Sequence, residues 1–254
     1  MNNTIKENVI ANFAGSYGIS IYDYCSENEI IGNTATYNQW GLCLGQYSTH
    51  NLITGNNFSR NTGHGIGFAG RNADYNTIDD NYICNNGDDG INSYMWHSEN
   101  NFTNNIINDN ADRGISLSSA ASNSIIHNNT IIGNQNYGIY ITDSTGGCRI
   151  SHNIICDSTI SGVEIRSGCN NHIIIGNNFI NCDLTDLGSN NINAMNSFDG
   201  VCSPLSIDEV SGVWGNFTWQ EVVEYVPWIS GDGSSINPYL IENLIINGTG
   251  TGNG

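Results

Sequence analysis

The chain has 254 residues and is strongly acidic, with 24 Asp and Glu against six Lys and Arg and a formal net charge of −18. This charge excludes nucleic acid and anionic membranes as direct partners, because both are themselves negatively charged. No run approaches the roughly 18 apolar residues that a membrane-spanning helix needs, so we expect no membrane insertion.

A glycine followed by an aliphatic residue recurs through most of the chain. Its positions are Gly18, Gly41, Gly65, Gly90, Gly114, Gly138 and Gly162. A second column keeps the same beat and consists of Asn33, Asn57, Asn81, Asn105, Asn129, Asn153 and Asn178. Two columns in phase, with spacings of 23 to 25 residues, are typical of a solenoid whose repeats bury their apolar faces on one another.

Within one repeat, apolar and polar residues alternate at period two, as in Gly114, Ile115 and Leu117. This is strand spacing, and the Asn, Gly, Asp and Ser between the short pieces are turn residues. An amphipathic helical pattern occurs only at about residues 218–226. We therefore predict an all-β fold over residues 1–198, a single-stranded parallel β-helix of about seven to eight coils.

The asparagine column has a structural explanation. Successive coils of such a solenoid stack about 4.8 Å apart. Identical amides at one turn position can then hydrogen-bond to each other up the stack. We expect an asparagine ladder rather than a ligand site.

The Asn-x-Ile-x-x-Asn and Gly-Ile-x-Leu units resemble the repeats of NosD-like and pectate-lyase-like β-helix proteins, including many surface proteins. The resemblance covers about three quarters of the chain and implies right-handed coiling. It is broad for function, because this scaffold carries lyases, hydrolases, binding modules and structural spacers.

The last quarter of the chain differs in pattern. Residues 227–254, with Pro227, Trp228 and Gly231 to Ser234, are similar to the segment that opens a β-helix in such surface proteins. Residues 199–226 are then a linker or a cap. Two alternatives stay open: a fragment of a tandem array, or a tail that caps the solenoid, as terminal repeats often do.

The residue directly before each repeat glycine varies far more than its surroundings. This pre-glycine column consists of Tyr17, Trp40, His64, Asp89, Arg113, Tyr137 and Ser161. Tyr140, on the following strand, extends the same surface. Aromatic rings stack on the C–H faces of sugars, and acids and Arg bond to hydroxyls. We therefore predict a carbohydrate-binding surface formed by Tyr17, Trp40, His64, Asp89, Arg113, Tyr137 and Tyr140.

A catalytic alternative rests on Gly63-His64-Gly65 and Asp88-Asp89-Gly90. These pieces resemble two motifs of polygalacturonase-type hydrolases, in which an Asp pair and a His surround the scissile bond. Their order is reversed here, and the Asn-Thr-Asp and Arg-Ile-Lys motifs are absent. Inverting hydrolysis needs two carboxyls, one of them protonated. Asp88, Asp89 and His64 are the candidates, against the alternative that they are solvated turn residues.

Metal and disulfide sites are further candidates. His127 and His152 fall in adjacent coils, where two imidazoles can share a transition metal. Calcium is a possible cofactor of the Asp-rich turns, although the calcium-binding nonapeptide is missing. Among the eight cysteines, Cys148 with Cys169 and Cys156 with Cys182 are candidate disulfides between neighbouring coils.

We expect an extracellular or cell-surface protein without enzymatic activity, structural or adhesive, that binds a polysaccharide or glycan. The alternative function is a β-helix polysaccharide hydrolase or lyase. Strand edges at an uncapped end also predict a homo-oligomer that stacks head to tail into filaments.

Overall fold

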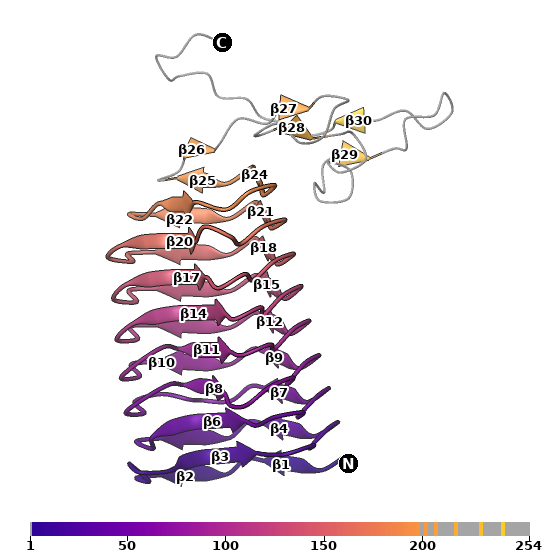
Figure 1. The fold of residues 1–254 in the computed structure, drawn as a ribbon. Helices are drawn as coiled ribbons and strands as arrows, with labels where there is room; N and C mark the ends of the chain where they lie inside the picture. Colours follow the sequence, from indigo (N-terminus) through magenta and orange to yellow (C-terminus); the bar gives the residue numbers. More distant parts are fainter. Residues whose placement is uncertain are drawn as a thin grey trace. The chain divides into compact units, whose positions relative to one another are not determined.

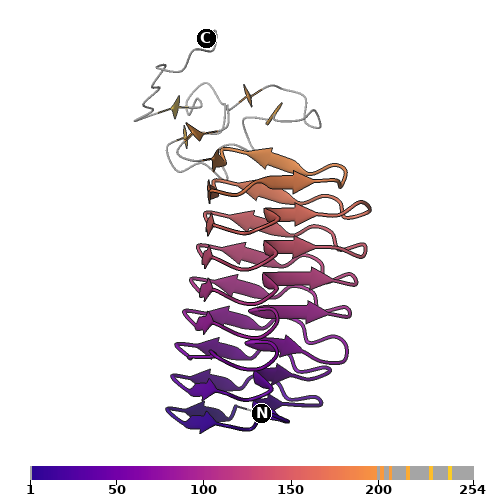
Figure 2. The same cartoon turned by 90° about the vertical axis from the view of Figure 1, so that its left-hand side faces the viewer.

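The computed structural model describes residues 2–198 together with five two-residue strands further along the chain. The chain divides into two compact units, Met1–Ser203 and Pro204–Gly254. The first unit is a β-solenoid of about eight turns, and the described residues contain no helix. This confirms the predicted fold class. Figures 1 and 2 show its coils stacked in chain order, from the indigo strands upward.

Three parallel sheets run along the solenoid. The first sheet contains β1 (Thr4–Lys6), β4 (Glu29–Ile31), β7 (Leu52–Thr54), β9 (Thr77–Asp79), β12 (Asn101–Thr103), β15 (Ile125–His127), β18 (Arg149–Ser151), β21 (Ile173–Ile175) and β24 (Ile192–Ala194). The second sheet contains β2 (Val9–Ala11) and β5 (Thr34–Thr36), then β10 (Tyr82–Cys84), β13 (Ile106–Asn108), β16 (Thr130–Ile132), β19 (Ile154–Cys156), β22 (Asn178–Ile180), β25 (Ser197–Phe198) and, antiparallel, β26 (Val201–Cys202). Isolated bridges at Asn57 join its two parts.

The third sheet carries the repeat glycines. It contains β3 (Tyr17–Ile21), β6 (Trp40–Leu44), β8 (Ile66–Phe68), β11 (Ile91–Tyr94), β14 (Arg113–Ser118), β17 (Tyr137–Ile141), β20 (Ser161–Ile165) and β23 (Leu184–Asp186).

The second unit contains two described strand pairs. They are β27 (Ser206–Ile207) with β28 (Asn216–Phe217), and β29 (Ile229–Ser230) with β30 (Leu240–Ile241). The predicted segments 199–226 and 227–254, including the helical pattern at 218–226, otherwise lie outside the described residues. None of the described residues forms a helix long and apolar enough to cross a membrane.

The core is a set of apolar columns inside the coils. In the first sheet, strand register places the same inward position of every coil above the last, and these residues have no exposed surface: Ile30, Ile53, Ile78, Phe102, Ile126, Ile150 and Ile174. Full burial of one such side chain contributes about 1.5–3 kcal/mol.

Buried asparagines form ladders, as predicted, but the register of the predicted column needs correction at two positions. The ladder passes through Asn33, Asn56 and Asn81, and later through Asn153 and Asn177. Asn57 and Asn178, the predicted members, lie one residue further on and belong to the second sheet. In these two Asn-Asn pairs the first amide belongs to the ladder.

Two more ladders run in parallel. One begins at Asn3, Asn28 and Asn51, and the other joins Asn61, Asn86 and Asn110. Each rung spans one coil with an amide-to-amide distance of 2.9 to 3.1 Å in these examples. The ladders hold every coil in register with the next.

The repeat glycines are required by close packing between coils. A β-carbon at Gly114 would lie 2.5 Å from the carbonyl oxygen of Gly138, and one at Gly65 would lie 2.7 Å from that of Gly90. Real β-carbons do not approach backbone oxygen so closely. The glycine beat therefore marks where neighbouring backbones touch, at the start of each third-sheet strand.

Candidate functional site

The pre-glycine column lies along the edge of the third sheet where its strands begin. Strand register pairs Tyr17 with Trp40, Arg113 with Tyr137, and Tyr137 with Ser161. Because each following glycine packs against the next coil, the side chain before it is held at a fixed position on this edge. The structure therefore places the predicted binding residues along one edge of the third sheet, although Asp89 is buried there rather than exposed.

Aromatic rings form the first part of this surface. The ring centroids of Tyr17 and Trp40 are 4.9 Å apart, and those of Trp40 and His64 are 5.0 Å apart. All three side chains remain partly exposed. Three rings in three successive coils thus follow the direction of the solenoid axis.

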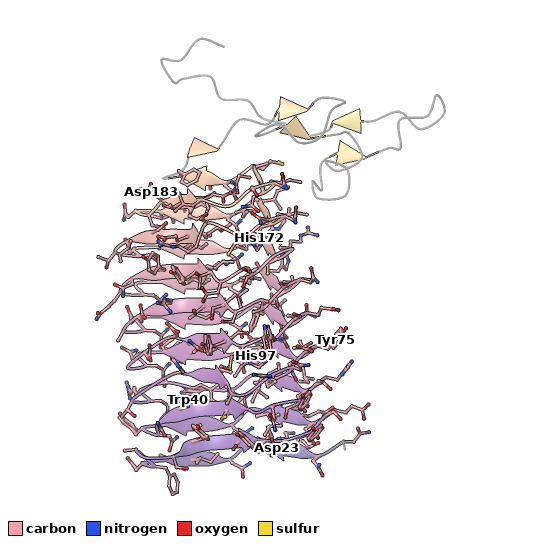
Figure 3. All side chains as sticks on the ribbon, viewed as in Figure 1. Asp23, Trp40, Tyr75, His97, His172 and Asp183 are labelled. Atoms are coloured by element: carbon pink, nitrogen blue, oxygen red, sulfur yellow. The ribbon has the colours of Figure 1, made fainter. Side chains whose placement is uncertain are left out.

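Trp40 lies in a cradle made by two glycines of the next coil. A β-carbon at Gly67 would fall 2.5 Å from two indole carbons, and one at Gly63 would fall 2.8 Å from a third. The indole therefore lies directly against backbone that carries no side chain. Trp40 is labelled in Figure 3, on β6.

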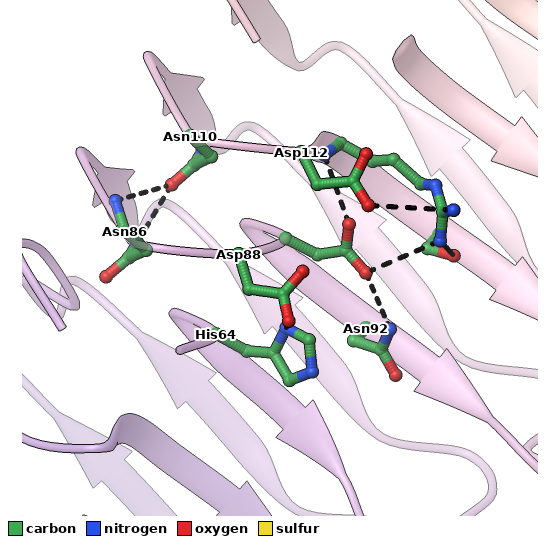
Figure 4. Close-up of polar contacts among 9 residues, drawn as sticks. His64, Asn86, Asp88, Asn92, Asn110 and Asp112 are labelled. Carbon is green, nitrogen blue, oxygen red and sulfur yellow. Dashed lines mark hydrogen bonds and ion pairs between the residues drawn. The ribbon is translucent and has the colours of Figure 1, made fainter. Parts of the chain in front are cut away.

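Asp89 occupies the centre of the column and is only 1% exposed. Its carboxylate accepts hydrogen bonds from Asn92 Nδ2 at 2.6 Å and from the backbone N–H of Arg113 at 3.1 Å (Figure 4). The guanidinium of Arg113 lies 3.9 Å away. Burial outweighs these contacts and raises the pKa of Asp89 to about 7.

His64, in the preceding coil, lies next to Asp88. Its Nδ1 is 3.7 Å from the Asp88 carboxylate and finds no hydrogen-bond partner among the described residues. Figure 4 shows the two side chains next to each other. Burial lowers the pKa of His64, and this outweighs the opposite effect of Asp88. The imidazole is therefore mainly neutral near pH 7, when Asp89 is poised between its two protonation states.

Arg113 connects the acidic centre to the two tyrosines. Its guanidinium lies 3.6 Å from Asp112 and 4.5 Å above the Tyr140 ring. Tyr140 in turn packs on Tyr137, with ring centroids 4.8 Å apart. The column therefore has three parts along its length: the rings that begin with Tyr17, the acidic centre with Arg113, and the tyrosine pair.

The ligand atoms of His64, Asp88 and Asp89 lie within 4.8 Å of one another, which is close enough to hold a metal ion. Both oxygens of Asp89 already accept hydrogen bonds, and the positive charge of Arg113 lies beside it. This environment opposes a bound cation. Calcium in the Asp-rich turns stays a prediction from the sequence.

The second candidate metal pair, His127 and His152, lies in adjacent coils with the rings close together. The rings of His127 and His152 meet edge to face, with centroids 5.3 Å apart. Register pairs His127 with Ser151, and its Nδ1 is 3.0 Å from the Ser151 hydroxyl. His127 thus has a neighbour that explains its position without a metal.

The candidate disulfides are not formed in the structure. Cys148, Cys169, Cys156 and Cys182 are all free thiols. Register pairs Cys156 with Ile180, two residues before Cys182. The Cys148 N–H donates to His172 of the next coil, and Cys148 and Cys169 both lie in the buried core.

Some residues of this surface were not expected from the sequence. Asn92 bonds to Asp89, Ser116 accepts from Arg113 at 3.3 Å, and Gly67 supports Trp40. Gly67 and Asn92 share one outward position of the third sheet, paired by register, and Ser116 continues it. Reading that position coil by coil would have found all three.

The sequence matches the family described as "Right handed beta helix region" over residues 1–122 and 67–180, which together exceed half of the chain. The chain belongs to the right-handed β-helix family. This confirms the resemblance found in the repeats. No curated protein matches the sequence.

Solved structures share the fold of this β-helix. A double mutant of the periplasmic alginate epimerase AlgG has a TM-score of 0.67 at 20% identity, over 77% of this chain and 50% of the epimerase. The A-module of the Azotobacter vinelandii mannuronan C-5 epimerase AlgE4 has a TM-score of 0.67 at 19% identity, over 85% of this chain and 63% of the module. An alginate lyase from Paenibacillus sp. str. FPU-7 has a TM-score of 0.64 at 14% identity, over 83% and 78%. The chain therefore spans only part of the two epimerases.

Proposed function

We propose that this β-helix binds a polysaccharide chain along the pre-glycine column, parallel to the solenoid axis. The observation that carries the proposal is the Trp40 indole, held flat over Gly67 between the rings of Tyr17 and His64. Rings at coil spacing offer successive sugar units a stacking surface. Aromatic side chains with a few fixed polar groups are the usual lining of ligand sites.

The central residues add hydrogen bonding and charge. Arg113, held by Asp112 and Tyr140, presents donors to hydroxyl or carboxylate oxygens. Asp88 presents a carboxylate that is about half exposed. The solved structures of an alginate lyase and alginate epimerases support a carbohydrate ligand, since their scaffolds are similar and their named substrates are polysaccharides.

We further propose that binding, without catalysis, is the main role, in an extracellular structural or adhesive protein. Asp89 is almost fully covered, and both of its oxygens are engaged by Asn92 and by the Arg113 backbone. A general acid or base must reach the substrate atom with which it exchanges a proton. Asp89 in this arrangement is better placed to hold Arg113 than to attack a substrate.

The test is binding of the purified chain to a panel of soluble polysaccharides, followed without and with Trp40→Ala. Loss of about tenfold in affinity is expected, the equivalent of about 1.4 kcal/mol. Tyr82→Ala is the matched control, because Tyr82 is an exposed aromatic on the second sheet. An unchanged affinity in Trp40→Ala would show that the ligand binds elsewhere.

A second function, cleavage of a polysaccharide by hydrolysis or elimination, is favoured by one observation. Asp89 has a pKa of about 7 and lies beside Asp88 and the neutral His64, so a carboxyl that can carry a proton near neutral pH lies in a cluster with a second carboxyl and an imidazole. Release of reducing ends or unsaturated products from neutral and acidic polysaccharides would reveal it. Activity that survives Asp89→Asn would exclude this assignment.

A further inference from the structure

Exposed aromatic residues gather at a second place, on the turns that follow the third-sheet strands. These turns lie at the opposite ends of the strands from the pre-glycine column. We define the aromatic turn strip as Tyr24, Tyr47, His50, Arg71, Tyr75 and Trp96, all of which are exposed. Figure 3 shows Tyr75 pointing away from the solenoid.

The strip consists of stacked pairs across neighbouring coils. Tyr24 and Tyr47 stack at 4.8 Å with their planes 12° apart, and His50 and Tyr75 stack at 5.0 Å and 18°. The guanidinium of Arg71 lies 4.4 Å above the Trp96 ring. The rings are thus ordered into a surface that runs across the first four coils.

The fold does not require aromatic residues here. Tyr24, Tyr47 and Trp96 have positive φ angles of 58°, 55° and 57°, a conformation that bulky side chains rarely adopt. The equivalent positions of other coils also have positive φ and carry small or polar residues, namely Asn72, Ala120, Ser144 and Gly168. A second turn column behaves in the same way. His50 and Tyr75 are followed there by Glu99, Asn123, Gly147 and Asn171.

We propose that the aromatic turn strip is a second binding site, for a neutral polysaccharide chain. Stacked rings suit the C–H faces of sugars. The acids beside them, Asp23, Glu27, Asp74 and Glu99, accept hydrogen bonds from hydroxyls and repel polyanions. Arg71 is the single arginine of the strip, and its guanidinium already lies over the Trp96 ring. The pre-glycine column differs, because Arg113 gives it a donor for anionic groups.

Asparagine substitutions separate binding from folding. Asn occurs naturally in the Tyr24–Tyr47 column at Asn72 and tolerates positive φ. The double variant Tyr47→Asn with Trp96→Asn therefore keeps the backbone conformation while it removes two rings. The matched control is Ala120→Asn with Ser144→Asn, at the equivalent positions of later coils.

The experiment is affinity electrophoresis of the full chain in native gels that contain hydroxyethylcellulose, galactomannan or alginate. We expect a neutral polysaccharide to retard the wild type, and the Tyr47→Asn, Trp96→Asn variant to bind about tenfold more weakly. The control variant should keep this binding. Melting temperatures of the double variant and of the wild type should be similar.

Three results would overturn the proposal. The first is a wild type that neither neutral polysaccharide retards. The second is full binding by the double variant, including the case in which only Trp40→Ala abolishes it, which would leave the proposed function of the pre-glycine column intact. The third is a wild type that is dimeric in light scattering and a double variant that is monomeric, because the strip would then join two copies of this chain.

Discussion

The indole of Trp40 lies so close to Gly67, one coil further on, that a β-carbon at position 67 would come within 2.5 Å of two ring carbons. Glycine at this position therefore fixes the orientation of the most prominent ring of the pre-glycine column. Aromatic residues that bind sugars act through their flat faces, so this orientation matters as much as the presence of Trp40.

Gly67→Ala should displace the Trp40 ring without unfolding the solenoid. We expect destabilisation of about 1–3 kcal/mol, typical of overpacking, and weaker polysaccharide binding. Thermal melting would measure the destabilisation, and tryptophan fluorescence during titration with polysaccharide would measure the binding. Gly15→Ala is the control, because nothing lies within 4 Å of a β-carbon at that position. Equal binding by both variants would contradict the proposed support of Trp40.

The stability of the chain should depend on pH through Asp89. The pKa of Asp89 is about 7 in the folded state against an ordinary value of 3.8. Between these values the folded chain keeps a proton that the unfolded chain releases. This contribution is therefore fully present below about pH 4 and is lost as the pH rises towards 7, with an upper limit of roughly 4 kcal/mol.

Asp89→Asn should remove this dependence. The lowered pKa of His64 acts in the opposite sense, because the unfolded imidazole takes up a proton first as the pH falls below 6.5. The comparison of wild type with Asp89→Asn cancels that contribution. Urea unfolding at several pH values between 4 and 8 would measure it, and parallel stability curves for the two proteins would refute it.

The buried ladder residue Asn105 should contribute more to the free energy of unfolding than its exposed neighbour Asn104. Asn105 Nδ2 donates to the Ile78 carbonyl at 2.9 Å and to Asn129 Oδ1 at 3.0 Å, and its Oδ1 accepts from Asn81. Asn105→Ala leaves buried partners unsatisfied, so we expect a loss of roughly 3–5 kcal/mol. Asn104→Gly, which keeps the positive φ of an exposed neighbour, should cost less than about 1 kcal/mol. Similar losses in denaturant unfolding would argue against a buried ladder.

Head-to-tail assembly stays a prediction, and the strand order of the described sheets shows how it can be tested. β1 and β3 each have a paired strand on one side only. Open strand edges favour stacking, whereas the net charge of −18 opposes it at low salt. Light scattering should therefore show species that grow with protein concentration and with salt. A monomer under all these conditions would rule assembly out for this chain.

The fold was accessible from the sequence because solenoid packing repeats the same local requirement in every coil. Gly114 must be glycine because the Gly138 carbonyl is in contact with it, and Ile126 must be apolar because it lies between Phe102 and Ile150. Each requirement recurs at coil spacing, so periodicity alone reveals it.

The ladder register was predicted less well because Asn-Asn pairs offer two choices at the same period. The position of the inward apolar residue decides between them. Asn56 follows buried Ile53 by three residues, just as Asn81 follows Ile78. Counting from the core therefore identifies Asn56, where counting between asparagines led to Asn57.

The contacts of the candidate site were predicted only in outline. The varied pre-glycine residues pointed to the surface, but the burial of Asp89 depends on neighbours from other coils, and so does the support of Trp40 by Gly67. The aromatic turn strip lies outside the glycine and asparagine columns, so the period of those columns does not reveal it. The repetition of Tyr24 and Tyr47 at coil spacing was the available signal.

The asparagine ladders fix the unit by which the solenoid can gain or lose length, and that unit is one whole coil. Every rung described runs in one direction, with an amide of one coil donating to the side-chain carbonyl of the following coil, as from Asn81 to Asn105 and from Asn105 to Asn129. Removal of one whole coil would therefore rejoin all three ladders, whereas removal of a part would turn core residues outward. Such a chain can change length in whole coils. Because the residue before each glycine differs from coil to coil, each added or removed coil would also change the side chains of the pre-glycine column.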